Sequence, residues 1–177
     1  MATDAEAAEF LLDRGADRVE HPGGTLLAHS RRVHAMLGEW GARPELRLAG
    51  LCHAFYGTDG FGTALGDPGR RDELAGVVGA EAERLVYVYA SCDRRRSYPH
   101  LTSPGGPFTD RFTRTVLYPP QADRRDFAEL TVANELDVLT ASAGLRAAHG
   151  DALAELFATW RPLLSTSAAR AVQDFRA

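Results

Sequence analysis

The chain has 177 residues, of which 45% are hydrophobic and 25% charged, and its formal net charge is -4. This length and composition suit one soluble globular domain, and the negative charge argues against a nucleic-acid partner. No apolar run approaches the roughly 18 residues of a membrane helix. The polar, acidic N-terminus is unlike a signal peptide, so a cytoplasmic protein is expected.

The basic residues are unusual, because all 20 of them are arginine. Without lysine, the chain cannot form a Schiff base with a carbonyl substrate. Together with the abundant alanine and glycine, this bias is typical of a GC-rich bacterial genome. The two cysteines, Cys52 and Cys92, are too few for a disulfide framework.

Helical signals dominate the first third of the chain. A short helix is expected over 5–13, where Thr3 and Asp4 precede it as capping residues. The breaker cluster 20–25 then ends in Thr25, a suitable N-cap for a helix over 26–40. A further helix over 44–56 starts at a proline and is apolar almost all round, which predicts a central, buried element.

The rest of the chain is also expected to be mainly helical, and it contains two long connections. The first, 57–70, is rich in glycine. The second, 93–120, is long for a structureless segment and is interpreted as a functional loop or lid. Residues 86–89 alone would also suit a strand. The further helices are expected at 72–78, 80–92, 121–143, 152–160 and 165–176.

Two histidines and, much later in the chain, one aspartate lie on apolar helix faces. His29 shares a stripe with Val33 and Trp40, and His53 lies near the end of the next helix. Much later, Asn134 and Asp137 share one face of the helix 121–143. A buried carboxylate must pair, bind a metal or pay a desolvation cost.

Two imidazoles and one carboxylate suit zinc, iron or manganese, and they also match the ligand set of many non-haem iron oxygenases. We therefore predict one divalent transition metal ion at His29, His53 and Asp137. The alternative remains open that each histidine is a hydrogen-bonded core residue. Asp137 would then cap a helix or pair with an arginine.

The segment His29-Ser30-Arg31-Arg32-Val33, the second histidine His53 and the late run 133–137 (Ala-Asn-Glu-Leu-Asp) resemble the HD-domain superfamily over about residues 20–140. This resemblance implies an all-helical fold and metal ligands in the order His, His-Asp pair, distant Asp. It also implies phosphohydrolysis as the commonest activity. The resemblance is to a variant bacterial branch, because Ala54 replaces the aspartate of the His-Asp pair.

Ala54 can neither bind nor bridge metals, which leaves a mononuclear site, a site completed by another residue, or a fold without metal. His21 is our first choice for a fourth ligand. His100, in the long connection, is placed where it would close over a substrate. His34 and His149 are interpreted as structural or exposed residues.

The loop after His53 carries the side chains that we expect to act beside the site. Tyr56, Thr58 and Asp59 are the candidate catalytic residues, because they follow His53 directly among glycines that let a ligand approach the backbone. A plain turn after a helix is the alternative. Arg111, flanked by Asp110 and Phe112, is the candidate for binding an anionic group, and Asn134 is a further substrate-binding candidate.

The sequence thus predicts an all-α, single-domain helical bundle over 1–177, with an HD-like core at about 20–140 and C-terminal helices at 150–177. The predicted function is a metal-dependent enzyme that acts on a small, anionic molecule, with hydrolysis ahead of iron-dependent oxygenation. A metal-free ligand-binding protein or acid–base enzyme is the second class, and a structural or partner-binding protein the third. A homodimer is left open, and neither membrane nor nucleic acid is expected as a partner.

Overall fold

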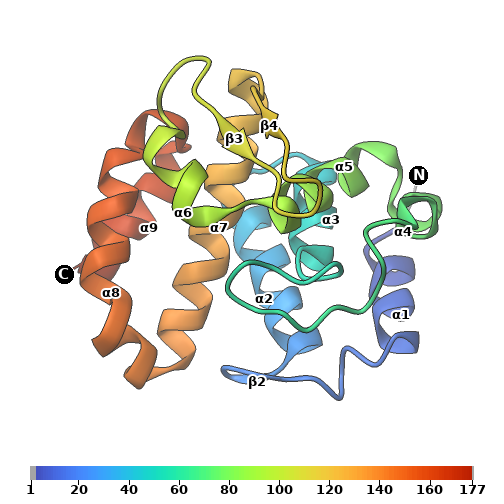
Figure 1. Cartoon of the computed structure of the whole chain (residues 1–177). Coiled ribbons are helices and arrows are strands. Elements are labelled where there is room, and N and C mark those ends of the chain that lie inside the picture. Colours follow the sequence, from blue (N-terminus) through green and yellow to red (C-terminus); the bar gives the residue numbers. More distant parts are fainter. Residues whose placement is uncertain (1–2, 177) are drawn as a thin grey trace.

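Two helices at the centre of the molecule, α2 and α7, organise the fold (Figure 1). The structure is a computed structural model that describes residues 3–176. In this part of the chain it is an all-α, single-domain bundle with two small antiparallel hairpins. Its α-helices are α1 (Asp4–Asp13), α2 (Leu26–Glu39), α3 (Pro44–Cys52), α4 (Arg71–Val78), α5 (Ala80–Ser91), α6 (Arg94–Ser97), α7 (Gln121–Ala141), α8 (Ala143–Thr159) and α9 (Thr166–Arg176).

The remaining elements are short. The strands β1 (Glu20–His21) and β2 (Gly24–Thr25) pair directly before α2, so the first hairpin leads into that helix. The strands β3 (Phe108–Thr109) and β4 (Val116–Leu117) form the second hairpin. Two 3-10 turns, η1 (Tyr98–His100) and η2 (Arg161–Leu163), complete the order.

The bundle has a continuous core that both ends of the chain help to fill. Helices α8 and α9 pack against α7 on one side of the molecule, whereas α1 and α4 lie on the opposite side (Figure 1). The buried cluster includes Leu11 from α1 and Phe157, Trp160 and Val172 from the C-terminal part. The hydrophobic core therefore includes residues from both ends of the chain.

Local signals explain how the site-bearing helices begin. The Thr25 hydroxyl accepts a hydrogen bond from the amide of Ala28, which caps α2 as predicted. Pro44 opens α3, where its missing N–H costs nothing. Helix α3 ends at Cys52 rather than at 56, so His53 lies at its C-terminal cap.

Two further segments differ from the sequence-based prediction. Helix α8 begins at Ala143, nine residues earlier than expected, because Ser142 caps it and Gly144 is tolerated inside the first turn. The connection 93–120 is not structureless: it contains α6, η1 and the second hairpin. The segment 86–89 is helical, as part of α5.

The connection 93–120 is anchored to the body of the protein by Arg124 of α7, which is 2% exposed. Its guanidinium donates to the carbonyl oxygens of Pro119 at 2.9 Å, of His100 and Leu101 at 3.2 Å each, and also of Gly106. One buried side chain thus satisfies four carbonyls of the segment and ties it to α7.

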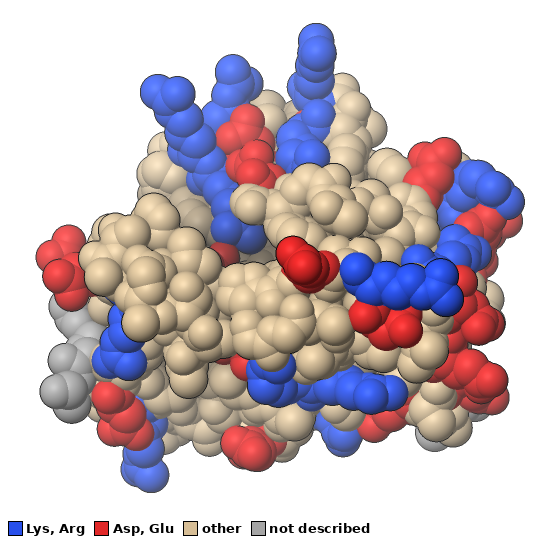
Figure 2. All heavy atoms as spheres, turned by 90° about the horizontal axis from the view of Figure 1, so that it is seen from below, with Lys and Arg blue, Asp and Glu red and all other residues tan. Residues whose placement is uncertain are grey.

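On the face shown in Figure 2, arginine and acidic side chains are interspersed, with uncharged surface between them. None of the helices in residues 3–176 combines the length and the apolar character that crossing a membrane requires.

Candidate functional site

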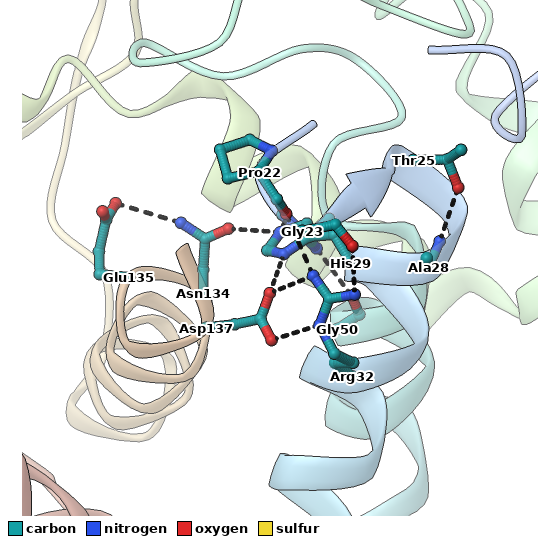
Figure 3. Close-up of polar contacts among 11 residues, drawn as sticks. Pro22, Gly23, Thr25, Ala28, His29, Arg32, Gly50, Asn134, Glu135 and Asp137 are labelled. Atoms are coloured by element: carbon teal, nitrogen blue, oxygen red, sulfur yellow. Dashed lines mark hydrogen bonds and ion pairs between the residues drawn. The ribbon is translucent and has the colours of Figure 1, made fainter. Parts of the chain in front are cut away.

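His29 of α2 is fully buried between two polar groups of α7. Its Nδ1 lies 2.6 Å from Oδ2 of Asp137, and its Nε2 lies 3.0 Å from Oδ1 of Asn134. Figure 3 shows both side chains of α7 pointing toward α2. The two nitrogens of one imidazole therefore face different partners, a carboxylate on one side and an amide oxygen on the other.

Asp137 is also bound by Arg32, one turn after His29 on α2. The guanidinium donates from Nε to Oδ1 at 2.7 Å and from Nη2 to Oδ2 at 2.9 Å (Figure 3). Burial by itself would raise the pKa of Asp137, but the hydrogen bonds from His29 and Arg32 outweigh it and lower that pKa below its usual value. The carboxylate is therefore ionised and accepts the Nδ1 hydrogen of His29.

His53 approaches the same point from the end of α3. Its Nδ1 donates to the carbonyl oxygen of Gly50 at 2.7 Å, so the hydrogen of the neutral ring lies on Nδ1 and Nε2 carries a lone pair. That Nε2 lies 3.2 Å from Nε2 of His29. Burial, aided by the neighbouring His29 ring, lowers the pKa of His53 to about 3, which keeps the ring neutral.

When both rings are neutral and carry their hydrogen on Nδ1, three acceptor atoms converge at this point. They are Nε2 of His29, Nε2 of His53 and Oδ1 of Asn134, and the last two lie within 3.2 Å of the first. Lone pairs this close in a buried site repel one another unless a positive charge lies among them. Either one proton or one metal ion at this point would satisfy the arrangement.

A cavity of about 250 Å³ opens beside the converging atoms. His53 and Asn134 form part of its wall, so the site is reached from the cavity. The other residues of the wall combine polar groups with apolar surface: His21, Pro22, Ala54, Thr58, Gly60, Phe61, Arg94, Glu135, Val138 and Leu145. A second cavity of about 280 Å³, beside Arg146 and Phe175, shares none of these residues.

Glu135 and Arg94 connect the site to the cavity wall. The Asn134 amide donates from Nδ2 to Oε1 of Glu135 at 3.1 Å, and Arg94 donates from Nη1 to the same oxygen at 2.9 Å. Neither residue was among the site candidates. Arg94 is the first of three consecutive arginines, and only its packing against α7 distinguishes it from Arg95 and Arg96.

The predicted fourth ligand, His21, lies near the site, but its ring does not point toward the atoms that converge there. Its ring stacks on that of His29, with centroids 4.0 Å apart and planes inclined by 22°. The in-plane lone pairs of stacked rings run side by side rather than toward one point. Burial lowers the pKa of His21 to about 4, and its buried Nδ1 has no partner among residues 3–176.

The three candidate catalytic residues have separate environments. Thr58 lines the cavity. The Tyr56 hydroxyl instead donates to Glu83 at 2.9 Å, in a buried contact away from the cavity wall. Asp59 accepts a hydrogen bond from the backbone N–H of Arg94 at 2.9 Å, so it fixes the start of α6. Of the three, the structure brings only Thr58 to the cavity.

The other substrate-binding candidates also differ in position. Asn134 lies at the centre of the site. Arg111 donates from Nε to the carbonyl oxygen of Ala90 at 2.8 Å and stacks over Phe112, so it holds the second hairpin in place. His100 is exposed in η1. Neither Arg111 nor His100 lines the cavity.

The ligand set expected from the sequence is therefore only partly assembled. Within the described residues, no three His, Cys, Asp or Glu side chains are grouped so that they could hold a metal ion together. The carboxylate of Asp137 contacts the Nδ1 side of His29, opposite the point where the Nε2 atoms converge. The third group at that point is the amide of Asn134, which was expected to contact substrate.

Among known proteins, one family model matches part of the chain. A family described as "Domain of unknown function (DUF6817)" matches residues 10–94, somewhat less than half of the chain. The matched segment contains His21, His29, His53 and Arg94 but not α7. No curated protein and no solved structure matches the chain.

Proposed function

We propose that this chain is an HD-like small-molecule enzyme, a hydrolase in the first place, which uses one divalent transition metal ion. His29 and His53 would hold the ion through Nε2, and Asn134 through its amide oxygen. The observation that carries the proposal is that the other two acceptors lie within 3.2 Å of the His29 Nε2, beside a cavity.

The donor set fits a metal ion in two respects. Imidazole nitrogen and amide oxygen suit zinc, manganese or iron(II). Both histidines also have their Nδ1 atoms bound to an acceptor, Asp137 for His29 and the Gly50 carbonyl for His53. Such outer hydrogen bonds orient ligating histidines in metal sites. When bound, the ion would lower the pKa of a water molecule and polarise a substrate oxygen.

The cavity wall supports a substrate of modest size and low charge. Arg94 offers hydrogen-bond donors to a substrate oxygen, and Phe61 and Leu145 provide apolar surface that excludes water. Because Glu135 already neutralises Arg94 at 2.9 Å, a doubly charged phosphate would meet an adjacent carboxylate. A neutral or singly charged ester or diester therefore fits this wall better than a phosphomonoester.

Iron-dependent oxygenation by two histidines and one carboxylate is less well supported. Asp137 would have to leave both His29 and Arg32 to reach the Nε2 side of the ring. Breaking this ion pair, in which the carboxylate is buried and Arg32 is partly exposed, would cost about 2–3 kcal/mol.

A second candidate function, metal-free acid–base catalysis, is favoured by a specific observation. Asp137, His29 and His53 form a continuous chain of contacts of 2.6 and 3.2 Å that ends at the cavity. A carboxylate that orients a histidine is the usual support for proton transfer at the far ring nitrogen. In this case a single proton, instead of a metal ion, would lie between the two Nε2 atoms.

Metal analysis separates these functions. The protein is purified aerobically and anaerobically, reconstituted with Zn²⁺, Mn²⁺ or Fe²⁺, and assayed with p-nitrophenyl acetate, bis-p-nitrophenyl phosphate and p-nitrophenyl phosphate. We expect about one equivalent of metal and hydrolysis of an ester or diester. Iron with oxygen consumption would favour the oxygenase. Less than about a tenth of an equivalent after reconstitution would overturn the metal proposal in favour of acid–base catalysis.

A further inference from the structure

One oxygen of Glu135 receives two hydrogen bonds. Oε1 accepts from Nδ2 of Asn134 at 3.1 Å and from Nη1 of Arg94 at 2.9 Å. Both donors come from the side of the cavity, which Asn134, Glu135 and Arg94 all line. Figure 3 shows the Asn134 amide between Glu135 on one side and His29 on the other.

This contact determines which end of the Asn134 amide faces the histidines. The two ends of an amide have nearly the same shape, so hydrogen bonds decide its orientation. With Nδ2 committed to Glu135, Oδ1 lies 3.0 Å from Nε2 of His29. In the opposite orientation, the amide oxygen would meet the Glu135 carboxylate and the NH₂ group would occupy the convergence point.

Arg94 fixes Glu135 in turn. Its backbone N–H is held by Asp59 at 2.9 Å, and its guanidinium also donates to the Tyr89 hydroxyl at 3.4 Å. The Glu135 side chain is 12% exposed and that of Arg94 is 25% exposed, so this ion pair is partly shielded from solvent. The position of Glu135 is therefore set by α6 and by the loop that carries Asp59.

We propose that Glu135, fixed by Arg94, is a positioning residue that turns the oxygen of Asn134 toward His29 and His53 and thereby makes this point a site for a cation. This inference rests on the proposed metal-dependent function. It assigns Glu135 no contact with the metal ion or with the reacting atoms. Its effect passes entirely through the amide of Asn134.

The test measures metal affinity rather than turnover. Zn²⁺ binding is titrated calorimetrically, and Co²⁺ absorption spectra report the ligand field, in Glu135→Met, Glu135→Gln, Asn134→Asp and the double variant Asn134→Asp/Glu135→Met. Glu135→Gln is the matched control, because its amide oxygen can accept from both donors. In Asn134→Asp, the carboxylate presents an oxygen to the histidines in either orientation, so Glu135 is not needed to orient it. Circular dichroism checks that each variant is folded.

We expect Glu135→Met to weaken Zn²⁺ binding about 10–100-fold and to change the Co²⁺ spectrum, as loss of an outer-shell partner does in metal sites. The Zn²⁺ affinity of Glu135→Gln should stay within about threefold of that of the parent protein. In the Asn134→Asp background, Glu135→Met should likewise lower the Zn²⁺ affinity by no more than about threefold. Equal losses in both backgrounds, or no loss in either, would overturn the positioning role. If the parent protein binds neither Zn²⁺ nor Co²⁺, the proposed function itself fails, and this inference with it.

Discussion

Nε2 of His29 and Nε2 of His53 lie 3.2 Å apart, and the Nδ1 atom of each ring contacts an acceptor that binds the hydrogen of a neutral imidazole. Two lone pairs at this distance need a shared positive charge. The Nδ1 atom of His29 contacts Asp137, and the Nδ1 atom of His53 contacts the Gly50 carbonyl. The rings therefore cannot turn away without losing buried hydrogen bonds. This relationship links the fold to its proposed chemistry.

Replacing His53 with alanine is expected to abolish metal binding. Loss of an outer-shell partner already costs about 10–100-fold in affinity, and loss of a direct ligand should cost more than about 100-fold. Calorimetric titration with Zn²⁺ measures the effect. His149→Ala removes an exposed histidine and is the matched control. Similar affinities in the two variants would show that the metal binds elsewhere.

Asp137→Asn is expected to destabilise the protein. The change keeps the shape of the side chain but removes the charge that accepts from both His29 and Arg32. Because Arg32 is 38% exposed, the loss should fall below that of a fully buried pair, at about 2–3 kcal/mol. Urea unfolding followed by circular dichroism gives the free energy. A change below about 0.5 kcal/mol would mean that the carboxylate carries little of this stability.

The histidines of the site were predictable from sequence because helical periodicity identifies the inward face of α2. His29 lies on the stripe that also contains the buried Val33. Asn134 and Asp137 were likewise placed on one face, and the structure directs both toward α2. Periodicity cannot show which nitrogen of His29 each of them meets. The pairing depends on how α2 and α7 are shifted along their axes relative to one another, and the contacting residues are more than 100 apart in sequence.

The connection 93–120 and the start of α8 were not predictable for a different reason. Glycines and prolines in these segments indicate breaks when local propensity alone is considered. In the fold, α8 packs against α7 and Ser142 caps it, so tertiary contact outweighs the cost of Gly144 and Gly150. The local sequence does not distinguish Arg94 from Arg95 and Arg96, whereas the fold pairs Arg94 with Glu135 of α7.

Arg124→Met is expected to loosen the connection 93–120 while leaving the helices near the site formed. The substitution retains an apolar stem but leaves the carbonyls of His100, Leu101, Gly106 and Pro119 without their donor. Each unsatisfied buried carbonyl costs about 1–3 kcal/mol, part of which water will restore. Hydrogen exchange should accelerate over 98–118 and not in α2. Unchanged exchange in that segment would argue against its anchoring by Arg124.

The two thiols should be unreactive in the native protein. Burial raises the pKa of Cys52 to about 12 and that of Cys92 to about 12, so at pH 8 almost no thiolate is present at either position. Because the thiolate is the reacting form, iodoacetamide should label neither residue in the folded chain and both in urea. Raising the pH toward 9 should increase labelling of the unfolded chain but not of the folded one. Peptide mass spectrometry assigns each label. Rapid labelling of Cys52 in the folded protein would contradict this prediction and would show that the end of α3 beside His53 opens to solvent.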